Sequence, residues 1–257
     1  MTIDPNTTIG QIVTDKPSRA RLFERLGIDY CCGGGLTLAA ACEKQGLIAT
    51  AVLDEVRASD AACSDGPPVD WEARGAGALA DHIEQEHHAY LKREVPRLQA
   101  LTEKVAAVHG GREPSLIELR DVYADFAGEM IEHMMKEERV LFPWIRTLAA
   151  GKSGAGCGGG GGGGCGCGGG GAPTQRGIEN PVRMMMIEHE HSGDALAKMR
   201  ALTGGFTPPP GACNTYVAML GGLAELEADT HAHVHKENSI LFPMAVKLEA
   251  ASAANKP

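Results

Sequence analysis

The sequence has few aromatic residues, which make up 4% of its 257 positions, and no apolar run long enough to cross a bilayer. Strands are enriched in aromatic and β-branched side chains, whereas Leu, Ala, Met and Glu, which are common here, favour helices. We therefore expect an all-α protein that does not enter a membrane.

Clusters of basic residues are also missing, and the net charge is −9. Contacts with nucleic-acid phosphates require grouped Lys and Arg side chains, so we exclude a nucleic-acid partner. The opening residues MTIDPNTTIG have neither the basic nor the apolar region of a signal peptide. These absences predict a cytoplasmic protein.

The eight cysteines lack the density and regular spacing of a secreted disulfide framework. In a reducing compartment their thiols would be free, bound to metal or redox-active. They stand at positions 31, 32, 42, 63, 157, 165, 167 and 213.

Composition divides the chain into a small domain, a linker and a longer domain. Residues 1–62 carry short helical patterns that Gly27, the run 33–35 and Gly46 interrupt, which predicts a small helical domain. The Gly-Pro-Pro content of the segment that follows predicts a linker over 63–74. Residues 75–250 contain four long helical patterns, at about 75–109, 113–149, 178–203 and 212–250.

The four long patterns form two helical hairpins. Gly110, Gly111 and Pro114 separate the first pair, and the segment TGGFTPPPGA separates the second. Between the pairs lies an insert at 151–177 that consists mostly of glycine and is expected to be a flexible coil. Two hairpins joined by a loop predict an up-down-up-down four-helix bundle.

The two hairpins look like copies of one unit. The segments HMMKEERVLFPWI (133–145) and HVHKENSILFPMA (233–245) share the pattern H-x-x-K-E-x-x-x-LFP. An acid-and-histidine cluster precedes each copy: IEQEHHAY (83–90) and IEHEHSGD (187–194). We expect the copies to supply symmetric ligands to a shared centre, and Pro143 and Pro243 to mark helix kinks or ends.

Each copy contains a His and a Glu four residues apart, which lie on one face of a helix. These pairs, His133/Glu137 and His233/Glu237, fall within the apolar stripes of their helices. Burying carboxylates without compensation would cost several kcal/mol each, and a bound cation removes that cost. The repeated pair therefore predicts a metal site in the bundle core.

The third and first helices supply further histidines. His189 lies on the apolar stripe of the third helix. On the first, His87 is slightly better centred, whereas the spacing to His133 favours His88; we prefer His88 and keep His87 as the alternative. This mixed nitrogen and oxygen set suits iron or manganese, bridged by the two Glu. His231 and His235 point away from the stripe, so we expect them in solvent.

The motifs HMMKEERVLFP, IEHEHSG and HVHKENSILFP resemble the hemerythrin-like domain of the iron–sulfur cluster repair di-iron proteins. The segment IGQIVTDKPSRARLFERLGIDYCCGG resembles the small domain that precedes it in that family. The resemblance implies two non-haem irons, bridged by carboxylates and by an oxo group in some states. The implied ligands are His88, His133, Glu137, His189, His233 and Glu237.

The same resemblance implies repair of iron–sulfur clusters damaged by nitric oxide or peroxide, so that the partners are damaged iron–sulfur proteins. Nitric oxide or oxygen is then the small ligand. Reduction of nitric oxide at the two irons and oxygen or redox sensing are the alternative functions. We leave open whether the protein turns over as an enzyme and whether it forms a homodimer.

Two sets of cysteines add to this chemistry. Cys31 and Cys32 follow a helix and precede three glycines, so we expect them to be exposed, mobile and without a mutual disulfide. Our hypothesis is that they accept or hand on iron, or exchange disulfides with a partner. Cys157, Cys165 and Cys167 of the insert are either part of a plain linker or capture a soft metal.

Overall fold

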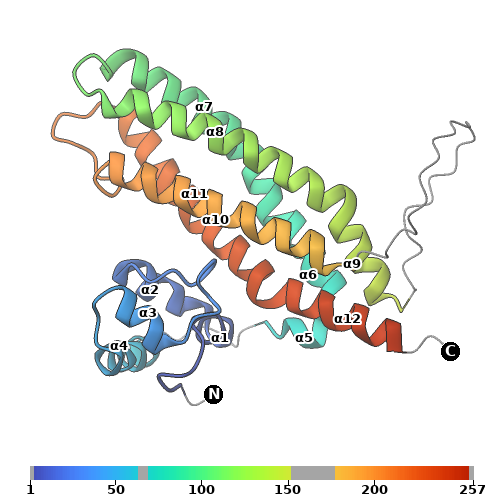
Figure 1. Cartoon of the computed structure of the whole chain (residues 1–257). Coiled ribbons are helices and arrows are strands. Elements are labelled where there is room, and N and C mark those ends of the chain that lie inside the picture. The colour runs from blue at the N-terminus through green and yellow to red at the C-terminus, as the bar shows by residue number, and fades with distance from the viewer. Residues whose placement is uncertain (1–2, 63–68, 152–176, 255–257) are drawn as a thin grey trace, which may run out of the picture.

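The computed structural model describes residues 3–62, 69–151 and 177–254, which form a small helical domain beside a long four-helix bundle (Figure 1). Within these residues there is no strand, only an isolated bridge between Thr8 and Thr37. The predicted all-α architecture is therefore confirmed. No helix in the described parts is long and apolar enough to cross a membrane.

The small domain consists of four short helices and one 3-10 turn. Thr8 and Thr37 cap the first and third helices, because their hydroxyls accept hydrogen bonds from the backbone N–H groups of Gln11 and Ala40. Gly27 ends the second helix in the left-handed region at φ 68°. The elements are α1 (Ile9–Asp15), η1 (Pro17–Arg19), α2 (Ala20–Leu26), α3 (Leu38–Lys44) and α4 (Ala49–Ala62).

Arg19 ties this domain together from a nearly buried position. Its Nε and Nη2 donate to the two carboxylate oxygens of Asp60 at 3.1 and 2.7 Å, which joins η1 to the end of α4. Its Nη1 donates to the carbonyl oxygen of Ile12 and to Asp15, both at 2.9 Å. This bidentate pairing with Asp60 is the geometry in which Arg binds carboxylates most strongly.

The bundle helices follow the predicted ranges closely. After the short α5 (Trp71–Arg74), the first comprises α6 (Ala76–Ile83), η2 (Glu84–His88) and α7 (Ala89–His109). The second comprises α8 (Ser115–Lys136), η3 (Glu137–Leu141) and α9 (Phe142–Ala149), and the third is α10 (Glu179–Leu202). The fourth comprises α11 (Asn214–Lys236), η4 (Glu237–Leu241) and α12 (Phe242–Ala254).

These helices form a closed ring in cross-section. The helix α7 contacts α8 and α11, and α10 contacts the same two neighbours, so each helix has two partners (Figure 1). Sequential helices are joined at their ends and run in opposite directions, which gives the predicted up-down-up-down bundle.

Three single π turns, η2, η3 and η4, interrupt the bundle helices. In η3 the N–H of Phe142 bonds to the carbonyl of Glu137, five residues back, and in η4 Phe242 bonds to Glu237 in the same way. The turns η3 and η4 end two residues before Pro143 and Pro243, and proline in a helix interior removes a backbone hydrogen bond and distorts the regular α pattern. Both prolines therefore interrupt the regular pattern, but the helices continue through them.

Apolar side chains pack on both sides of a central polar band in the bundle. One cluster, toward the α7–α8 connection, includes the fully buried Tyr123 and Phe126. The other, toward the α9 and α12 ends, includes Phe142, Ile145 and Phe242. Burial of these side chains provides the main driving force for folding, and the polar band lies between the two clusters.

The small domain packs on α11 and η4 of the bundle, and the two share apolar contacts. Val234 of α11 belongs to the buried cluster of the small domain. Gly10 of α1 lies so close to η4 that a Cβ there would be 2.6 Å from Ser239 Oγ. The close approach of α1 to η4 thus depends on a glycine.

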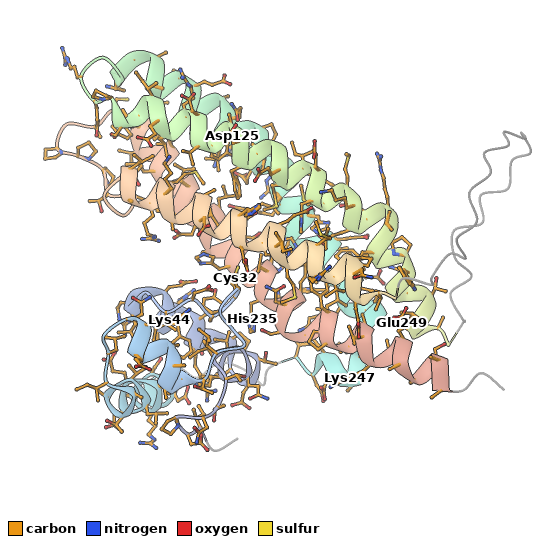
Figure 2. All side chains as sticks on the ribbon, in the orientation of Figure 1. Cys32, Lys44, Asp125, His235, Lys247 and Glu249 are labelled. Carbon is orange, nitrogen blue, oxygen red and sulfur yellow. The ribbon has the colours of Figure 1, made fainter. Side chains whose placement is uncertain are left out.

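His235, labelled in Figure 2, lies in this interface. Its position off the apolar stripe of its helix predicted exposure to solvent, and that prediction is wrong. His235 is 5% exposed, and its Nε2 lies 3.3 Å from the hydroxyl of Thr14. Its ring also meets Tyr30 edge to face. Burial lowers its pKa to about 4. The stripe of one helix did not reveal that a second domain covers its outer face.

Candidate metal centre

Six side chains from all four bundle helices converge on the central polar band. Each is at most 3% exposed. The two acids begin the π turns η3 and η4, and the histidines come from η2, α8, α10 and α11. They are His88, His133, Glu137, His189, His233 and Glu237. The structure therefore brings together every residue that the repeat and the resemblance selected as a ligand.

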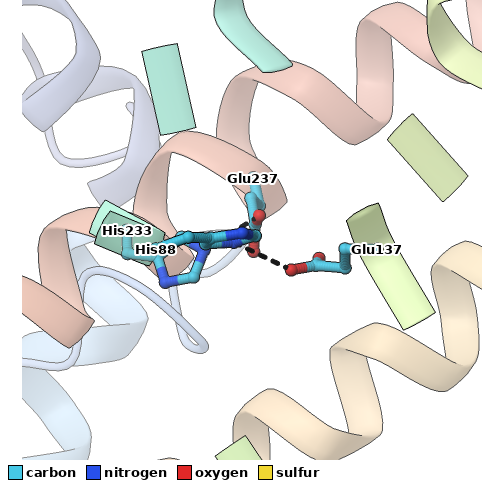
Figure 3. Close-up of side chains that lie close together, drawn as sticks. All are labelled: His88, Glu137, His233 and Glu237. Carbon is cyan, nitrogen blue, oxygen red and sulfur yellow. Dashed lines mark hydrogen bonds and ion pairs between the residues drawn. The ribbon is translucent and has the colours of Figure 1, made fainter. Parts of the chain in front are cut away.

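The six residues form two groups of four that share both acids. The first group contains His88 and His233, and the second contains His133 and His189. Glu137 and Glu237 belong to both groups, and within each group the ligand atoms lie within 4.8 Å of one another. Figure 3 shows the first group, in which both carboxylates face the imidazoles. Such a geometry can hold two ions bridged by two carboxylates.

In all four histidines, Nε2 is the nitrogen that faces the acids. The Oε2 of Glu137 lies 3.3 Å from Nε2 of His88 and 3.4 Å from that of His133. The Oε2 of Glu237 lies 3.1 Å from Nε2 of His189, and its Oε1 lies 3.0 Å from Nε2 of His233. Each acid thus contacts one histidine from each group.

The donor set fits a pair of cations. Both carboxylates are fully buried, and neither oxygen of Glu137 has a hydrogen-bond partner among the described residues. The same holds for Oε2 of Glu237 and Nε2 of His88. Buried polar atoms in proteins almost always have partners, so a cluster of such atoms points to bound metal. Imidazole and carboxylate donors together suit iron or manganese.

The buried acids and imidazoles shift one another's pKa values. Burial opposes the charged form of His133, but Glu137 and Glu188 outweigh it and raise the pKa of His133 to about 10. Burial likewise opposes ionisation of Glu237, but His233 and His189 hold the pKa of that carboxyl well below its usual range. Metal and protons therefore compete for the same imidazole nitrogens.

Three of the four histidines are fixed from behind by an oxygen acceptor at Nδ1. The distances are 2.8 Å for His88 to Glu138, 2.9 Å for His133 to Glu188, and 2.9 Å for His189 to Asn238. Such partners orient the ring so that Nε2 faces the metal, and they raise its basicity. These three acceptors lie outside the predicted ligand set, although Glu138 and Asn238 each directly follow a predicted ligand.

His87, the alternative to His88, lies outside both groups. Its Nδ1 is 2.9 Å from Asp229 and its Nε2 is 2.6 Å from the ammonium of Lys236. The choice was difficult from the sequence because both residues lie in the π turn η2, where the regular helical period fails.

Cys32, labelled in Figure 2, lies where the small domain meets α10. The neighbouring Cys31 is less exposed than predicted. Cys31 is 5% exposed, and the Sγ of Cys32 lies 3.5 Å from the carbonyl oxygen of His189. Asp29 fixes the loop, because its carboxylate accepts hydrogen bonds from the N–H groups of Cys31, Cys32 and Gly33. The expected exposure of Cys31 is therefore wrong, because its side chain belongs to the buried cluster of the small domain.

The two thiols are free and lie 3.9 Å apart, sulfur to sulfur. The hydrogen bond with Cys32 and burial raise the pKa of Cys31 well above its usual value. Asn238 connects this loop to the metal site, since its Nδ2 donates to the carbonyl oxygen of Cys31 and its Oδ1 meets His189.

A cleft of about 370 Å³ opens beside the thiols, between the small domain and the bundle. Five acidic residues and one Arg, Arg200, contribute to its lining. An excess of negative charge in a concave surface attracts cations. The acids are Glu24, Asp29, Glu190, Asp194 and Glu227.

The remaining cysteines are placed only in part. Cys42 is buried in the small domain, and Cys213 is exposed. Cys63 and the insert thiols Cys157, Cys165 and Cys167 lie outside the described residues, as does the insert itself apart from Gly151 and Gly177.

Fold and site together define a four-helix-bundle metalloprotein of the histidine–carboxylate type, joined to a thiol-bearing helical domain. Comparison with protein families agrees. Residues 78–157 and 173–245 match the hemerythrin HHE cation binding domain, and residues 5–60 match a domain of unknown function (DUF542).

Known proteins of similar sequence extend the match over almost the whole chain. The iron-sulfur cluster repair protein ScdA of Staphylococcus haemolyticus is 30% identical, covering 93% of this chain and 98% of that protein. The iron-sulfur cluster repair protein YtfE of Dickeya chrysanthemi is 31% identical (94% and 97%), and that of Cronobacter sakazakii is 32% identical (93% and 95%). The chain belongs to the hemerythrin-like family of iron–sulfur cluster repair proteins.

Proposed function

We propose that this protein repairs damaged iron–sulfur clusters in the cytoplasm by supplying iron from a labile centre of two non-haem irons. The observation that carries the proposal is the pair of four-residue groups that share Glu137 and Glu237. The names of the relatives, which describe iron–sulfur cluster repair, support the same function. Damaged iron–sulfur proteins are then the partners.

The two groups support distinct ligand roles. His88 and His233 would hold one ion and His133 and His189 the other, with Glu137 and Glu237 common to both. Four protein donors would leave each iron open positions, so iron would exchange more readily than from a closed site. When bound, the irons serve as the store from which a damaged cluster is refilled.

Cys31 and Cys32 form the delivery arm in this proposal. Two thiolates on one tetrahedral ion with bonds of about 2.3 Å lie roughly 3.8 Å apart. The observed sulfur separation is 3.9 Å, so the pair can chelate one ion with little rearrangement. The acidic cleft beside them keeps cations close to the thiols.

The delivery arm is tested with full-length, iron-loaded protein in which Cys31 and Cys32 are both replaced by Ser. Recovery of activity is followed in a [4Fe–4S] enzyme inactivated by nitric oxide. We expect unchanged iron content and a repair rate at least about tenfold lower, because Ser oxygen is a poor ligand for soft metals. Cys42→Ser, which changes a buried thiol of the same domain, should alter neither quantity.

Repair at the wild-type rate in the double variant would refute the arm and leave iron supply standing. Iron supply itself is tested with Glu137→Ala, which removes a residue common to both groups. Full repair activity in a variant that has lost its iron would refute the proposed function.

Reduction of nitric oxide to nitrous oxide is a second candidate function. Two ions held by groups that share Glu137 and Glu237 would lie close together, and when bound they would supply the redox chemistry that this reaction needs. Sustained nitrous oxide formation with added reductant, lost in Glu137→Ala but retained when Cys31 and Cys32 are replaced, would favour this function over delivery.

A further inference from the structure

The internal repeat allows the surroundings of the two groups to be compared position by position. His133, Lys136 and Glu138 correspond to His233, Lys236 and Asn238, one hundred residues later. Upstream of these segments, His88 corresponds to His189. The residues that immediately precede these two ligands, His87 and Glu188, therefore also correspond.

In the second group, both histidines have an oxygen acceptor at Nδ1. Glu188 accepts from His133 at 2.9 Å, and its other oxygen receives a hydrogen bond from the ammonium of Lys136 at 2.6 Å. His189 is paired with the amide oxygen of Asn238. Both imidazoles are therefore held in position from behind.

In the first group, only His88 has such a partner, Glu138. The Nδ1 of His233 is buried and has no hydrogen-bond partner in the described part of the chain. His87 occupies the position corresponding to Glu188. Its ring stacks on His233, with centroids 5.4 Å apart and planes inclined by 6°, and its Nε2 lies 2.6 Å from Lys236.

A stacked ring cannot replace the carboxylate, because it presents its π face and not a lone pair to the neighbouring imidazole. His233 therefore lacks the support that raises ligand basicity and fixes ring orientation. Loss of one such partner typically weakens metal binding about 10- to 100-fold.

We propose that the two iron positions are unequal: the ion held by His88 and His233 is released first, and His87 is the positioning residue that keeps this site labile. The inference rests on the proposed di-iron centre and specifies which of its ions is supplied. His87 contacts no ligand atom of the metal. It acts by occupying the place where the other group has a carboxylate.

The test follows iron release from the full-length, loaded protein into an excess of a ferrous chelator. Wild type should release its iron in two phases of equal amplitude. His87→Glu should slow the fast phase about 10- to 100-fold, because the new carboxylate can pair with His233 and Lys236 as Glu188 pairs with His133 and Lys136. The slow phase should not change.

Glu188→Ala tests the same inference from the other group and does not depend on whether His87→Glu folds. It should accelerate the slow phase by a similar factor, so that the two phases merge. Glu179→Ala, which changes an exposed acid at the start of the same helix, should change neither phase.

A single release phase in wild type with about two irons per chain would overturn the inference without affecting the di-iron function. The same holds if His87→Glu folds, binds both irons and leaves the fast phase unchanged. A wild-type protein that binds no iron would instead refute the proposed function itself.

Discussion

The shared acids make a quantitative prediction about metal-linked stability. His88 belongs to one group only, whereas Glu137 belongs to both. His88→Ala therefore reduces the donors of one ion from four to three, and Glu137→Ala does so for both ions. The stability that iron adds to the second variant should fall twice as far.

The magnitude follows from binding linkage. At a free iron concentration of about 100 times the wild-type Kd, each ion stabilises the folded state by about 2.7 kcal/mol. Removing an outer partner weakens metal binding about 10- to 100-fold, which serves as a lower bound for a lost ligand. Each affected ion then contributes about 1.3 to 2.3 kcal/mol less, so the expected losses are about 1.3–2.3 kcal/mol for His88→Ala and about 2.6–4.6 kcal/mol for Glu137→Ala.

The assay is thermal unfolding of each variant with buffered ferrous iron and after treatment with a chelator. The difference between the two Tm values isolates the contribution of iron, because effects of the substitution on the metal-free fold cancel. For a domain of this size, the difference should shrink by about 3–9 °C for His88→Ala and by about 5–18 °C for Glu137→Ala.

His109→Ala is the matched control, because it removes an imidazole at the far end of α7 that lies outside both groups. It should leave the iron-dependent difference in Tm unchanged. Equal losses for His88→Ala and Glu137→Ala would refute the division into two groups. A large loss for His87→Ala would refute the choice of ligand.

Two further predictions concern the small domain. Because hydrogen bonds from Arg19 hold the pKa of Asp60 below its usual value, Asp60→Asn should lower the free energy of unfolding by about 1–2 kcal/mol at neutral pH. The ion pair stabilises the fold above the unfolded pKa of about 3.9. The difference in unfolding free energy between Asp60→Asn and wild type, measured by urea titration, should therefore close as pH falls through the lower, folded pKa. The exposed Asp54→Asn should have little effect, and a difference that widens in acid would contradict this account. Gly10→Val should force α1 away from η4 at a cost of about 1–3 kcal/mol, and hydrogen exchange in η4 should become faster. Gly128→Ala, whose new Cβ would meet no neighbour, should not change this exchange. Unchanged exchange in Gly10→Val would show that the contact is unimportant.

The fold and the two His–Glu pairs were accessible from the sequence because both depend on short-range rules. The pairs His133/Glu137 and His233/Glu237 follow from helical spacing alone, and the repeat identified them as parts of one centre. Helix ends at glycines and prolines were equally predictable.

Other features were not predictable because they depend on contacts between distant segments. The π turns displace the ligands from the regular period, which made the choice between His87 and His88 difficult. The burial of His235 arises only when the small domain docks on the bundle, where its ring meets Thr14 and Tyr30. The stripe of a single helix records its own core face and contains no information about a second domain on its outer face.

Val234 has a consequence for how the two domains depend on each other. Because this bundle residue completes the apolar cluster of the small domain, removing residues 1–62 would expose apolar surface on α11. A truncated bundle would then be prone to self-association, and loss of repair could reflect aggregation instead of a missing delivery arm. The two domains therefore form one cooperative unit. Substitutions on the outer surface of α11 must remain compatible with the apolar cluster of the small domain.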